Sequence, residues 1–151
     1  MKKDNVKLSR RKTGGGAVYH DLGNTCFSFL TPYDKEQKLE YRTINNQIIL
    51  DALSKLQVKA EVSGRNDMVV DGKKFSGSAY RLFLGGKDGD GKKSLHHGTI
   101  MFSVNFNALQ KYLNPNKKKL ESKGIDSVIS RVANLTEIHP TLSHSSFCRE
   151  L

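Results

Sequence analysis

Alternating apolar and polar residues predict several short strands in this chain, and one longer stretch repeats with the period of a helix. Val6 and Leu8 alternate with polar neighbours, and segments 17–20 and 25–30 carry the β-branched and aromatic residues typical of strands. Between residues 33 and 56 the period changes, which predicts a solvated helix with one apolar stripe. The stripe consists of Tyr41, Ile44, Ile48, Ala52, Leu53 and Leu56.

The second half of the chain predicts a hairpin and further intermingled elements. Asp71-Gly72 separates the segments 67–70 and 73–84, and this pair is a strong hairpin signal because glycine tolerates the positive φ of a tight turn. Further strands are expected at 58–62 and 97–106, with a loop at 85–94 between them. Helices are expected at 107–113 and, after a serine cap, at the end of the chain. The order predicts one α/β or α+β sheet domain.

Composition adds a strong positive charge to this picture. The 151 residues contain 25 Lys and Arg against 15 Asp and Glu, a formal net charge of +10. This surplus favours acidic partners, such as nucleic acid, anionic lipid, an acidic protein or a phosphorylated small molecule, without choosing among them. No apolar run approaches the roughly 20 residues that cross a bilayer, and the N-terminus lacks the apolar core of a secretory signal.

The cysteine count argues for a reducing compartment. Cys26 and Cys148 lie far apart and have neither the spacing of a zinc site nor that of a disulfide framework. Both thiols are expected to be buried and inert.

Three candidate ligand-binding patterns are rejected. Gly86, Gly91 and Lys92 fit a phosphate loop, but Lys93 stands where Ser or Thr would bind magnesium, and a strand follows instead of a helix. The segment 88–93 lacks the downstream glutamate of a calcium loop. The adjacent histidines 96 and 97 point to opposite faces of a strand and cannot share a metal ion.

The segment 10–24, RRKTGGGAVYHDLGN, favours an anion-binding loop. Consecutive glycines let backbone N–H groups approach a phosphate, and the neighbouring arginines add charge-assisted contacts. The alternative is an ordinary tight turn beside a solvated run of charges.

The segment 73–80, KKFSGSAY, indicates a lysine on a strand lined with small residues. Strand alternation places Lys74, Ser76, Ser78 and Tyr80 on one face and Phe75, Gly77 and Ala79 on the other. A lysine in a small polar groove can neutralise charge that develops on a carboxylate or phosphate. The alternative is a lysine that extends from an edge strand into solvent.

Four motifs together resemble a known family. The segments 10–24, 64–80, 96–102 and 114–135 occur in the order found in bacterial-type lipoate-protein ligases, and the resemblance runs from about Asn5 to the end of the chain. It implies the biotin/lipoate ligase fold, a mixed and largely antiparallel sheet flanked by helices. It also implies that lipoate and Mg-ATP give lipoyl-AMP and pyrophosphate, and that the lipoyl group then passes to a lysine of a lipoyl domain.

The same resemblance implies roles for individual residues. Lys74 matches the catalytic lysine, which holds the lipoate carboxylate and the α-phosphate together. Asn66 and Asp67 match a position near the phosphates and Mg²⁺, and His20, His97 and Gly98 fall in the lipoate pocket. The ATP and lipoyl-adenylate site would comprise Arg10, Arg11, Gly14, Gly15, Gly16, Ala17, Val18, Tyr19, Lys74, Ser76, Gly77, Ser78, Ala79, Lys119, Lys123, Gly124 and Ser127.

The resemblance also sets expectations for the whole protein. Residues 1–151 would form one catalytic domain, incomplete at its N-terminus and without the accessory domain of bacterial ligases. Partners would be the lipoyl domains of 2-oxoacid dehydrogenase complexes and the glycine-cleavage H protein, with no nucleic acid and no membrane, and the protein would be a monomer. It would lie in the cytoplasm of a bacterium, or in the mitochondrial matrix or cytoplasm of a eukaryote.

Three alternatives stay open at this point. A lipoyltransferase would use preformed lipoyl-AMP, and an octanoyltransferase would work through a cysteine thioester. A basic nucleic-acid-binding module is the alternative from another class, and its affinity would fall steeply with salt.

Overall fold

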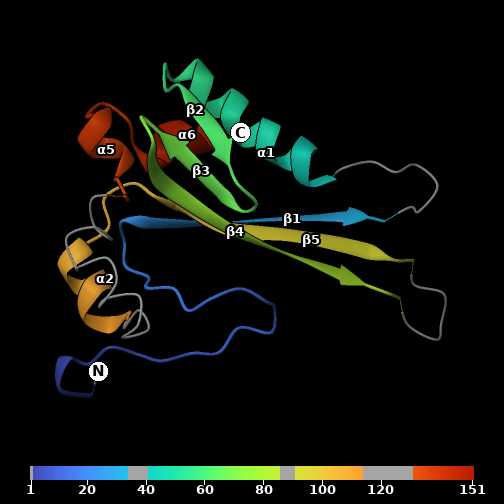
Figure 1. The fold of residues 1–151 in the computed structure, drawn as a ribbon, viewed down its shortest axis with the longest axis horizontal. Helices are drawn as coiled ribbons and strands as arrows, with labels where there is room; N and C mark the ends of the chain where they lie inside the picture. The colour runs from blue at the N-terminus through green and yellow to red at the C-terminus, as the bar shows by residue number, and fades with distance from the viewer. Residues whose placement is uncertain (1, 34–40, 86–90, 114–130) are drawn as a thin grey trace.

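A five-stranded sheet organises the domain, with helices on one face and the N-terminal segment on the other (Figure 1). The computed structural model describes residues 2–33, 41–85, 91–113 and 131–151. Every neighbouring strand pair in the sheet is antiparallel. In spatial order the strands are β1 (Asn24–Pro32), β5 (Lys93–Met101), β4 (Lys73–Phe83), β3 (Asp67–Val70) and β2 (Ala60–Ser63).

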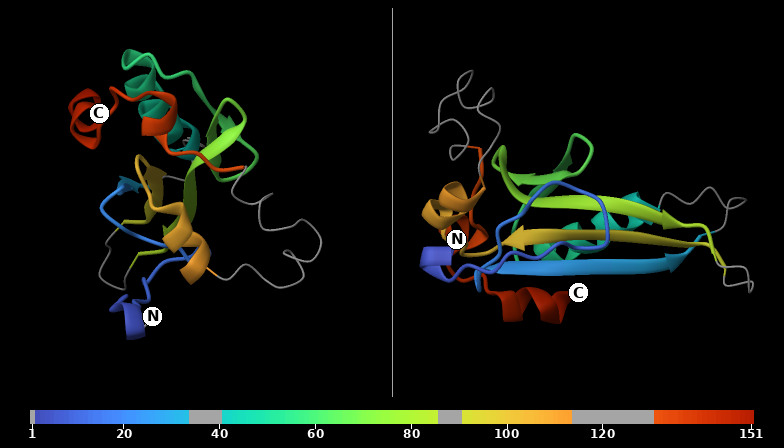
Figure 2. Two further views of the ribbon diagram at one scale, coloured as in Figure 1. Left: turned by 90° about the vertical axis from the view of Figure 1, so that its left-hand side faces the viewer. Right: turned by 90° about the horizontal axis from the view of Figure 1, so that it is seen from below.

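Helices pack mainly around one face and one end of this sheet (Figure 2). The longest helix, α1, covers the face of the sheet opposite the N-terminal segment. The helical elements are η1 (Lys2–Asp4), α1 (Tyr41–Lys55), α2 (Phe106–Tyr112), α5 (Leu135–Ile138) and α6 (His144–Glu150). This mixture of helices with an antiparallel sheet confirms the predicted fold class.

The predicted hairpin at Asp71-Gly72 is confirmed, and its turn explains why it forms. Asp71 has φ 49° and Gly72 has φ 71°, so both turn residues lie in the left-handed region. A tight turn with two such residues matches the twist of the flanking strands, here β3 and β4. The serine cap of the last helix is also confirmed, because Ser143 and Ser146 form a reciprocal capping box at the start of α6.

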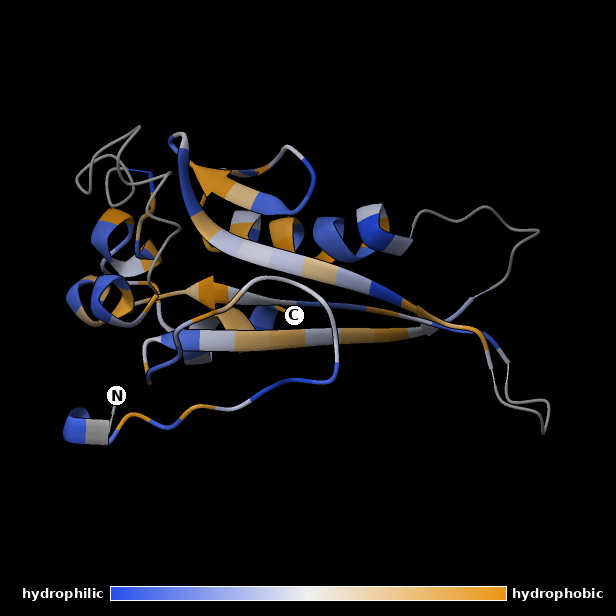
Figure 3. Cartoon of the chain, turned by 60° about the horizontal axis from the view of Figure 1, so that its bottom comes forward, coloured by the Kyte–Doolittle hydropathy of each residue, from blue (hydrophilic) through white to orange (hydrophobic). Residues whose placement is uncertain are grey.

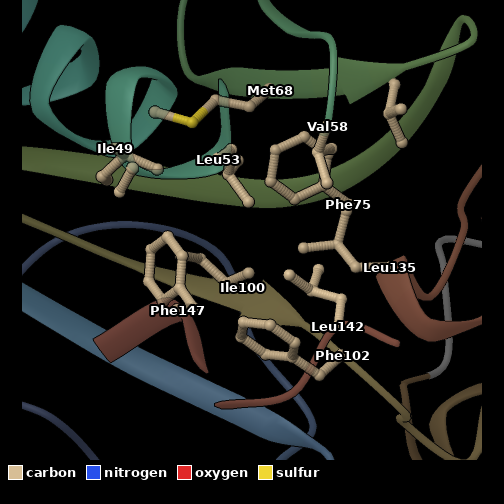
Figure 4. Close-up of a cluster of buried hydrophobic side chains, with 12 residues drawn as sticks. Ile49, Leu53, Val58, Met68, Phe75, Ile100, Phe102, Leu135, Leu142 and Phe147 are labelled. Atoms are coloured by element: carbon tan, nitrogen blue, oxygen red, sulfur yellow. The ribbon is translucent and has the colours of Figure 1, made fainter. Parts of the chain in front are cut away.

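The hydrophobic core lies between the sheet, α1 and the C-terminal helices (Figure 4). Its largest fully buried side chains include Phe75 from β4 and Phe147 from α6. Helix α1 is confirmed, but its buried face is rotated from the predicted stripe, since Ile44 and Ile48 are 43% and 37% exposed. The residues that α1 buries are Asn45, Asn46, Ile49, Ala52 and Leu53.

Two predicted strands before residue 24 do not form. Residues 6–8 and 17–20 have no regular secondary structure. The chain here is closed into a loop, because the Arg11 guanidinium donates to the carbonyls of Gly14 and Gly16. This loop arches over the sheet (Figure 3), so its apolar residues contact other segments without joining a strand ladder.

The strand predicted at 97–106 begins earlier and ends earlier than expected. β5 starts at Lys93, where it pairs with β1 and β4, and it stops at Met101. The N–H groups of Phe102 and Ser103 both donate to the carbonyl of Gly23, and this turn ends the ladder. The helix predicted after it is confirmed as α2, with an N-cap from Asn105. Half of the predicted loop at 85–94, residues 86–90, lies outside the described residues, and its last two residues, Lys93 and Ser94, belong to β5.

Candidate active site

An irregularity in β4 places the candidate catalytic lysine on the face of the sheet that the N-terminal loop covers. The pairing with β3 runs Met68 to Ser76 and then Val69 to Lys74, so one residue of β4, Phe75, is left over. Such a bulge reverses the alternation of side chains along a strand. Lys74 therefore lies on the side of Gly77, and the predicted face shared by Lys74, Ser76, Ser78 and Tyr80 is wrong. Ser76 is buried on the helix side.

The ammonium group of Lys74 lies over Gly77 and beside Asp67. A Cβ atom on Gly77 would be 3.1 Å from Lys74 Nζ and 3.2 Å from its Cε. Lys74 Nζ is 2.7 Å from Asp67 Oδ1, and both side chains are about two-fifths exposed, at 39% and 41%. The Lys74 ammonium thus lies against the backbone of Gly77, forms an ion pair with the Asp67 carboxylate and is partly exposed to solvent. An anion can approach it from the loop side.

The backbone of Lys74 is held by a segment that is distant in the sequence. Its N–H donates to the carbonyl of Arg131 at 2.7 Å, and its carbonyl accepts from the N–H of Ala133 at 2.9 Å. These bonds form a parallel bridge between Lys74 and Val132. The predicted adenylate loop precedes this bridge directly in the chain, and its residues Lys119, Lys123, Gly124 and Ser127 lie outside the described residues.

Arg11 holds the triple-glycine loop in shape. Its Nε and Nη2 donate to the Gly14 carbonyl at 3.1 and 2.9 Å, and Nη2 donates to the Gly16 carbonyl at 2.7 Å. Gly15 has φ +109°, and a Cβ there would lie 2.5 Å from Arg11 Nη2 and 3.2 Å from the Cβ of Ala79. The tip of the loop therefore packs on β4, and only glycine fits at its centre.

The loop and the lysine thus meet on one face of one strand. Ala79, which the loop contacts, is two residues from Gly77, which the lysine contacts, and residues two apart in a strand share a face. The next residue on this face, Arg81, donates to the carbonyl of Lys12 and anchors the other end of the loop. Sequence reasoning missed Arg81. Its alternation with Ala79 was the available signal.

The adjacent histidines separate as predicted, one to each face. His97 pairs with Ala79 in the ladder. Burial and the nearby charge of Arg11 lower the pKa of His97. His96 is fully buried on the helix side, against the rings of Phe27, Phe29 and Tyr80.

Gly98 and the two serines of β4 face away from the loop. A Cβ on Gly98 would lie 2.5 Å from the Phe27 ring, which is on the helix side. Ser78 donates through its N–H and its Oγ to the Asn66 carbonyl, so it holds the turn that carries Asp67. Gly98, Ser76 and Ser78 are thus placed to shape the site from beneath.

Both cysteines are exposed, so the expectation of buried thiols is wrong. Cys26 Sγ lies 3.8 Å from His20 Nδ1, at the base of the loop. Cys148 Sγ lies 3.6 Å from His144 Nε2, one turn away on α6. They belong to separate regions, and no disulfide joins them.

A cavity of about 660 Å³ adjoins the loop. Its lining combines apolar and aromatic side chains from the N-terminal segment, the loop and the end of α2 with the polar residues Lys7, Ser9, Arg11 and His20. Tyr19 stacks on Tyr112 with ring centroids 5.9 Å apart. A mostly apolar cavity of this size accommodates a small organic ligand. The lining includes Val6, Leu8, Val18, Tyr19, Tyr112 and Leu113.

The described part of the chain contains no group of three or more His, Cys, Asp or Glu side chains that could hold a metal ion. A helix both long and apolar enough to cross a membrane is likewise absent from those residues. A metal at Asn66 and Asp67 would therefore depend on oxygen ligands from a bound phosphate.

The structure thus defines an α+β domain in which a partly exposed lysine and a glycine-rich loop share one face of the sheet, and comparison with known proteins identifies its family. The family model described as the lipoyl protein ligase A/B catalytic domain matches residues 1–151. The chain belongs to this family. Lipoate-protein ligase A of Blochmanniella floridana is 46% identical over 155 residues, which is all of this chain and 43% of the relative.

Solved structures agree with this assignment. A bi-partite lipoate protein ligase from Thermoplasma acidophilum, studied with its E2 lipoyl domain, matches with a TM-score of 0.80 and 28% identity. The match covers 99% of this chain and 56% of the T. acidophilum chain. P. falciparum LipL1 in complex with lipoate matches with a TM-score of 0.76 and 39% identity, and the match covers 99% of this chain and 38% of LipL1. A lipoate-protein ligase A bound with ATP matches with a TM-score of 0.76 and 25% identity, and the match covers 99% of this chain and 57% of that ligase. The chain thus spans well under two-thirds of each.

Proposed function

We propose that this protein provides the catalytic centre of a lipoate-protein ligase, which activates lipoate with ATP and transfers the lipoyl group to a lysine of a lipoyl domain. The observation that carries the proposal is the position of the Lys74 ammonium, over Gly77 and on the face that the loop around Gly15 covers. The relatives' complexes with lipoate and with ATP support the same pair of substrates.

The reaction needs positive charge at one point. In the first step a lipoate carboxylate oxygen attacks the α-phosphorus of ATP, and pyrophosphate leaves. Both reactants are anionic, so a fixed cation between them lowers their repulsion and stabilises the charge shared in the transition state. Lys74 suits this role because its ammonium is partly exposed and, among the residues that the structure describes, pairs with a single carboxylate, that of Asp67.

The second step removes the acyl group from the adenylate. The amine of the acceptor lysine attacks the acyl carbonyl carbon, an amide forms and AMP leaves. Lys74 again offsets the negative charge on the phosphate and on the carbonyl oxygen. No covalent bond to the protein is required.

The loop and the adjoining cavity provide places for the nucleotide. Arg11 uses its donors on the Gly14 and Gly16 carbonyls, so it shapes the loop rather than binding phosphate through those same contacts. Arg10 is exposed beside it and adds charge. The aromatic surface of Tyr19 in the adjoining cavity suits a purine ring.

Magnesium fits this site only together with the nucleotide. Mg²⁺ typically binds one or two carboxylates and takes its remaining ligands from water and substrate phosphates. Asp67 would supply a carboxylate oxygen and Asn66 an amide oxygen. The bound ion would neutralise phosphate charge.

Lipoyl domains of 2-oxoacid dehydrogenase complexes and the glycine-cleavage H protein are the proposed acceptors. The relative from T. acidophilum was studied with an E2 lipoyl domain. The net charge of +10 would speed the encounter with an acidic acceptor domain, and this contribution would weaken as salt rises. We propose that the protein acts as a monomer in the compartment that holds these acceptors.

Replacement of Lys74 tests the proposal, with Lys73 as a matched control one residue away. Lys74→Ala is expected to lower lipoyl-AMP formation by about 10²–10³-fold, the usual effect of removing one preorganised stabilising group. Lys73→Ala should retain activity, since Lys73 is exposed at the hairpin turn. Pyrophosphate release from ATP and lipoate is measured, together with binding of lipoyl-AMP to the 151-residue chain.

Three results would contradict the proposal. Undiminished adenylation by Lys74→Ala would remove the assigned role of the lysine. Transfer from preformed lipoyl-AMP without any pyrophosphate release would indicate a lipoyltransferase. Saturable binding of DNA at physiological salt, with no binding of lipoyl-AMP, would favour the nucleic-acid module.

A further inference from the structure

The end of α2 contributes an aromatic ring to the cavity beside the glycine loop. Tyr112 and Leu113 line the cavity, together with Val6 and Leu8 of the N-terminal segment. The Tyr112 ring is nearly parallel to that of Tyr19, with the ring centroids 5.9 Å apart and 20° between the planes. Two aromatic rings from segments far apart in the sequence therefore lie together in the cavity lining.

Two charged side chains hold Tyr112 in this position. Asp4 Oδ2, from η1 beside α2 (Figure 2), forms an ion pair with Lys111 Nζ at 3.0 Å. Hydrogen bonds from Lys111 and from Tyr112 to the Asp4 carboxylate lower the pKa of Asp4. The Lys111 ammonium also lies 5.3 Å from the centroid of the Tyr112 ring, a distance at which an aromatic face attracts a cation. We call these three side chains, Asp4, Lys111 and Tyr112, the clasp.

The clasp ties the N-terminal segment to α2 at one end of the cavity. Among the residues that the structure describes, 5–10 form no hydrogen bond with any other segment. Beyond this stretch the chain is fixed again, because Arg81 donates to the carbonyl of Lys12. The segment 5–10 is therefore held at its two ends, and the clasp is the end that includes a ring of the cavity lining.

We propose that Tyr112 is a positioning residue for the base of the bound nucleotide and that the clasp holds it in place, an inference that rests on the proposed function. A purine base gains affinity by stacking on an aromatic side chain, and less of this gain is lost when the ring is already ordered. Tyr112 orders the ring of Tyr19, while Asp4 and Lys111 order Tyr112. Release of the clasp loosens both the pair of rings and the segment 5–10.

The two parts of the clasp differ in strength. Its ion pair is exposed to solvent, with 60% of the Lys111 side chain and 37% of the Asp4 side chain accessible. Loss of an exposed pair of this kind changes an equilibrium by about two- to fivefold. Loss of an aromatic stack changes the affinity for a base by about five- to hundredfold. Substitutions of the ion pair and of the ring should therefore give effects of different size.

Binding of Mg-ATP to the full 151-residue chain tests the inference, with inorganic tripolyphosphate as a probe that carries phosphates without the base. Tyr112→Leu, which removes the ring, is expected to raise the dissociation constant of ATP by about five- to hundredfold. Tyr112→Phe keeps the ring and loses the hydrogen bond to Asp4, so it should raise this constant about two- to fivefold, as should Asp4→Asn. The dissociation constant of tripolyphosphate should stay unchanged in all three variants.

Glu150→Gln is the matched control for the ion pair. Glu150 pairs with Lys55 at 3.6 Å, and the exposed fractions of these side chains, 37% and 60%, equal those of Asp4 and Lys111. Neither Glu150 nor Lys55 lines the cavity, so Glu150→Gln should leave the binding of ATP unchanged. The combined effect of Asp4→Asn and Tyr112→Phe should be smaller than the product of the single effects, because both changes act on the same contact.

Steady-state kinetics separates positioning of the base from a general loss of structure. In the assay of pyrophosphate release, Tyr112→Leu should raise the KM for ATP and leave the KM for lipoate unchanged, because the proposal places only the base in this cavity. The melting temperature is measured for every variant. Should Tyr112→Leu fail to fold, Tyr112→Phe and Asp4→Asn, compared with Glu150→Gln, decide the question by themselves.

Failure of this inference differs from failure of the proposed function. Unchanged affinity for ATP in Tyr112→Leu and Asp4→Asn, or equal weakening of ATP and tripolyphosphate binding, overturns the role of Tyr112. An effect of Glu150→Gln as large as that of Asp4→Asn overturns it as well. In each of these cases the ligase function stands if the native chain binds ATP and lipoate. Absence of binding of both substrates to the native chain overturns both proposals.

Discussion

Gly77→Ala is expected to impair catalysis without weakening the fold. The added Cβ would lie 3.1 Å from Lys74 Nζ and 3.2 Å from Cε, closer than the usual carbon contact. Lys74 has a flexible side chain, so it would give way by about 0.3–0.9 Å to reach ordinary contact distances of about 3.4–4 Å. The fold should not lose stability, because alanine lowers the conformational entropy of the unfolded chain relative to glycine, an effect that favours folding by about 0.5–1 kcal/mol.

The size of the catalytic loss follows from that displacement. A misplacement of about 1 Å at a reacting group costs about 10²-fold in rate, so a shift of a few tenths predicts a loss of about tenfold in kcat/KM for lipoyl-AMP formation. The ion pair of Lys74 with Asp67, now 2.7 Å, would lengthen or re-form elsewhere. Both side chains are partly exposed, so this change adds little to stability.

Pyrophosphate release and thermal unfolding are measured on Gly77→Ala and on Gly98→Ala. The second variant is the contrast, because its Cβ would lie 2.5 Å from the Phe27 ring and 2.6 Å from the backbone oxygen of Gly77. Backbone cannot yield as a lysine tip does, so Gly98→Ala should lower the melting temperature. Full activity in Gly77→Ala would refute the placement of the ammonium at the reacting centre. Equal destabilisation of both variants would show that Gly77 serves the sheet instead.

Two further predictions concern the loop and the buried histidine. Arg11→Ala should weaken binding of lipoyl-AMP by more than it lowers unfolding free energy, because its exposed side chain bonds only the Gly14 and Gly16 carbonyls within the loop in the described contacts; a melting shift that exceeds the binding loss would contradict this. Burial, with the charge of Arg42, lowers the pKa of His96 from 6.5 to about 4. The unfolded chain therefore takes up a proton that the folded chain refuses, so stability is full above about pH 6.5 and falls by about 3 kcal/mol as the pH drops to about 4. Urea unfolding across this range checks it, and His96→Gln should flatten the slope.

Local chemistry made the hairpin and the last helix predictable. Asp71-Gly72 specifies its turn through backbone conformations that few residue pairs adopt, and Ser143 caps α6 through its own neighbours. Both depend on contacts within a few residues. Such features can be predicted from a single sequence because no distant segment is needed to produce them.

The faces of β4 were not predictable in the same way. Strict alternation places Lys74 with Ser76, whereas the unpaired Phe75 reverses the order at that point. The bulge depends on how β3 and the segment 131–133 pair with β4, which involves residues far along the chain. For the same reason α1 buries Asn45 and Ile49 instead of Ile44 and Ile48, since the position of the sheet decides which side of the helix is covered.

In the candidate site, too, features set by local sequence were predictable and those set by distant segments were not. Residue types and spacing identified Lys74 and the glycine loop, and the structure brings both to one face of β4. The contribution of Arg81, and the nearness of Cys26 to His20, arise only from the register of the strands and the path of the loop. Strand alternation places Arg81 on the same face as Ala79, but the sequence alone does not reveal which groups either Arg81 or Cys26 contacts.

The two backbone bonds that join Lys74 to Arg131 and Ala133 have a mechanical consequence. The first residues of β4 are held by hydrogen bonds to a segment outside the sheet. The position of the Lys74 ammonium therefore depends on residues that come much later in the sequence. Any change that displaces residues 131–133 would shift the backbone of Lys74 through these two hydrogen bonds, and the ammonium would move with it. A substitution far from every reacting atom would then lower the rate in an assay in the same way as a substitution of Lys74.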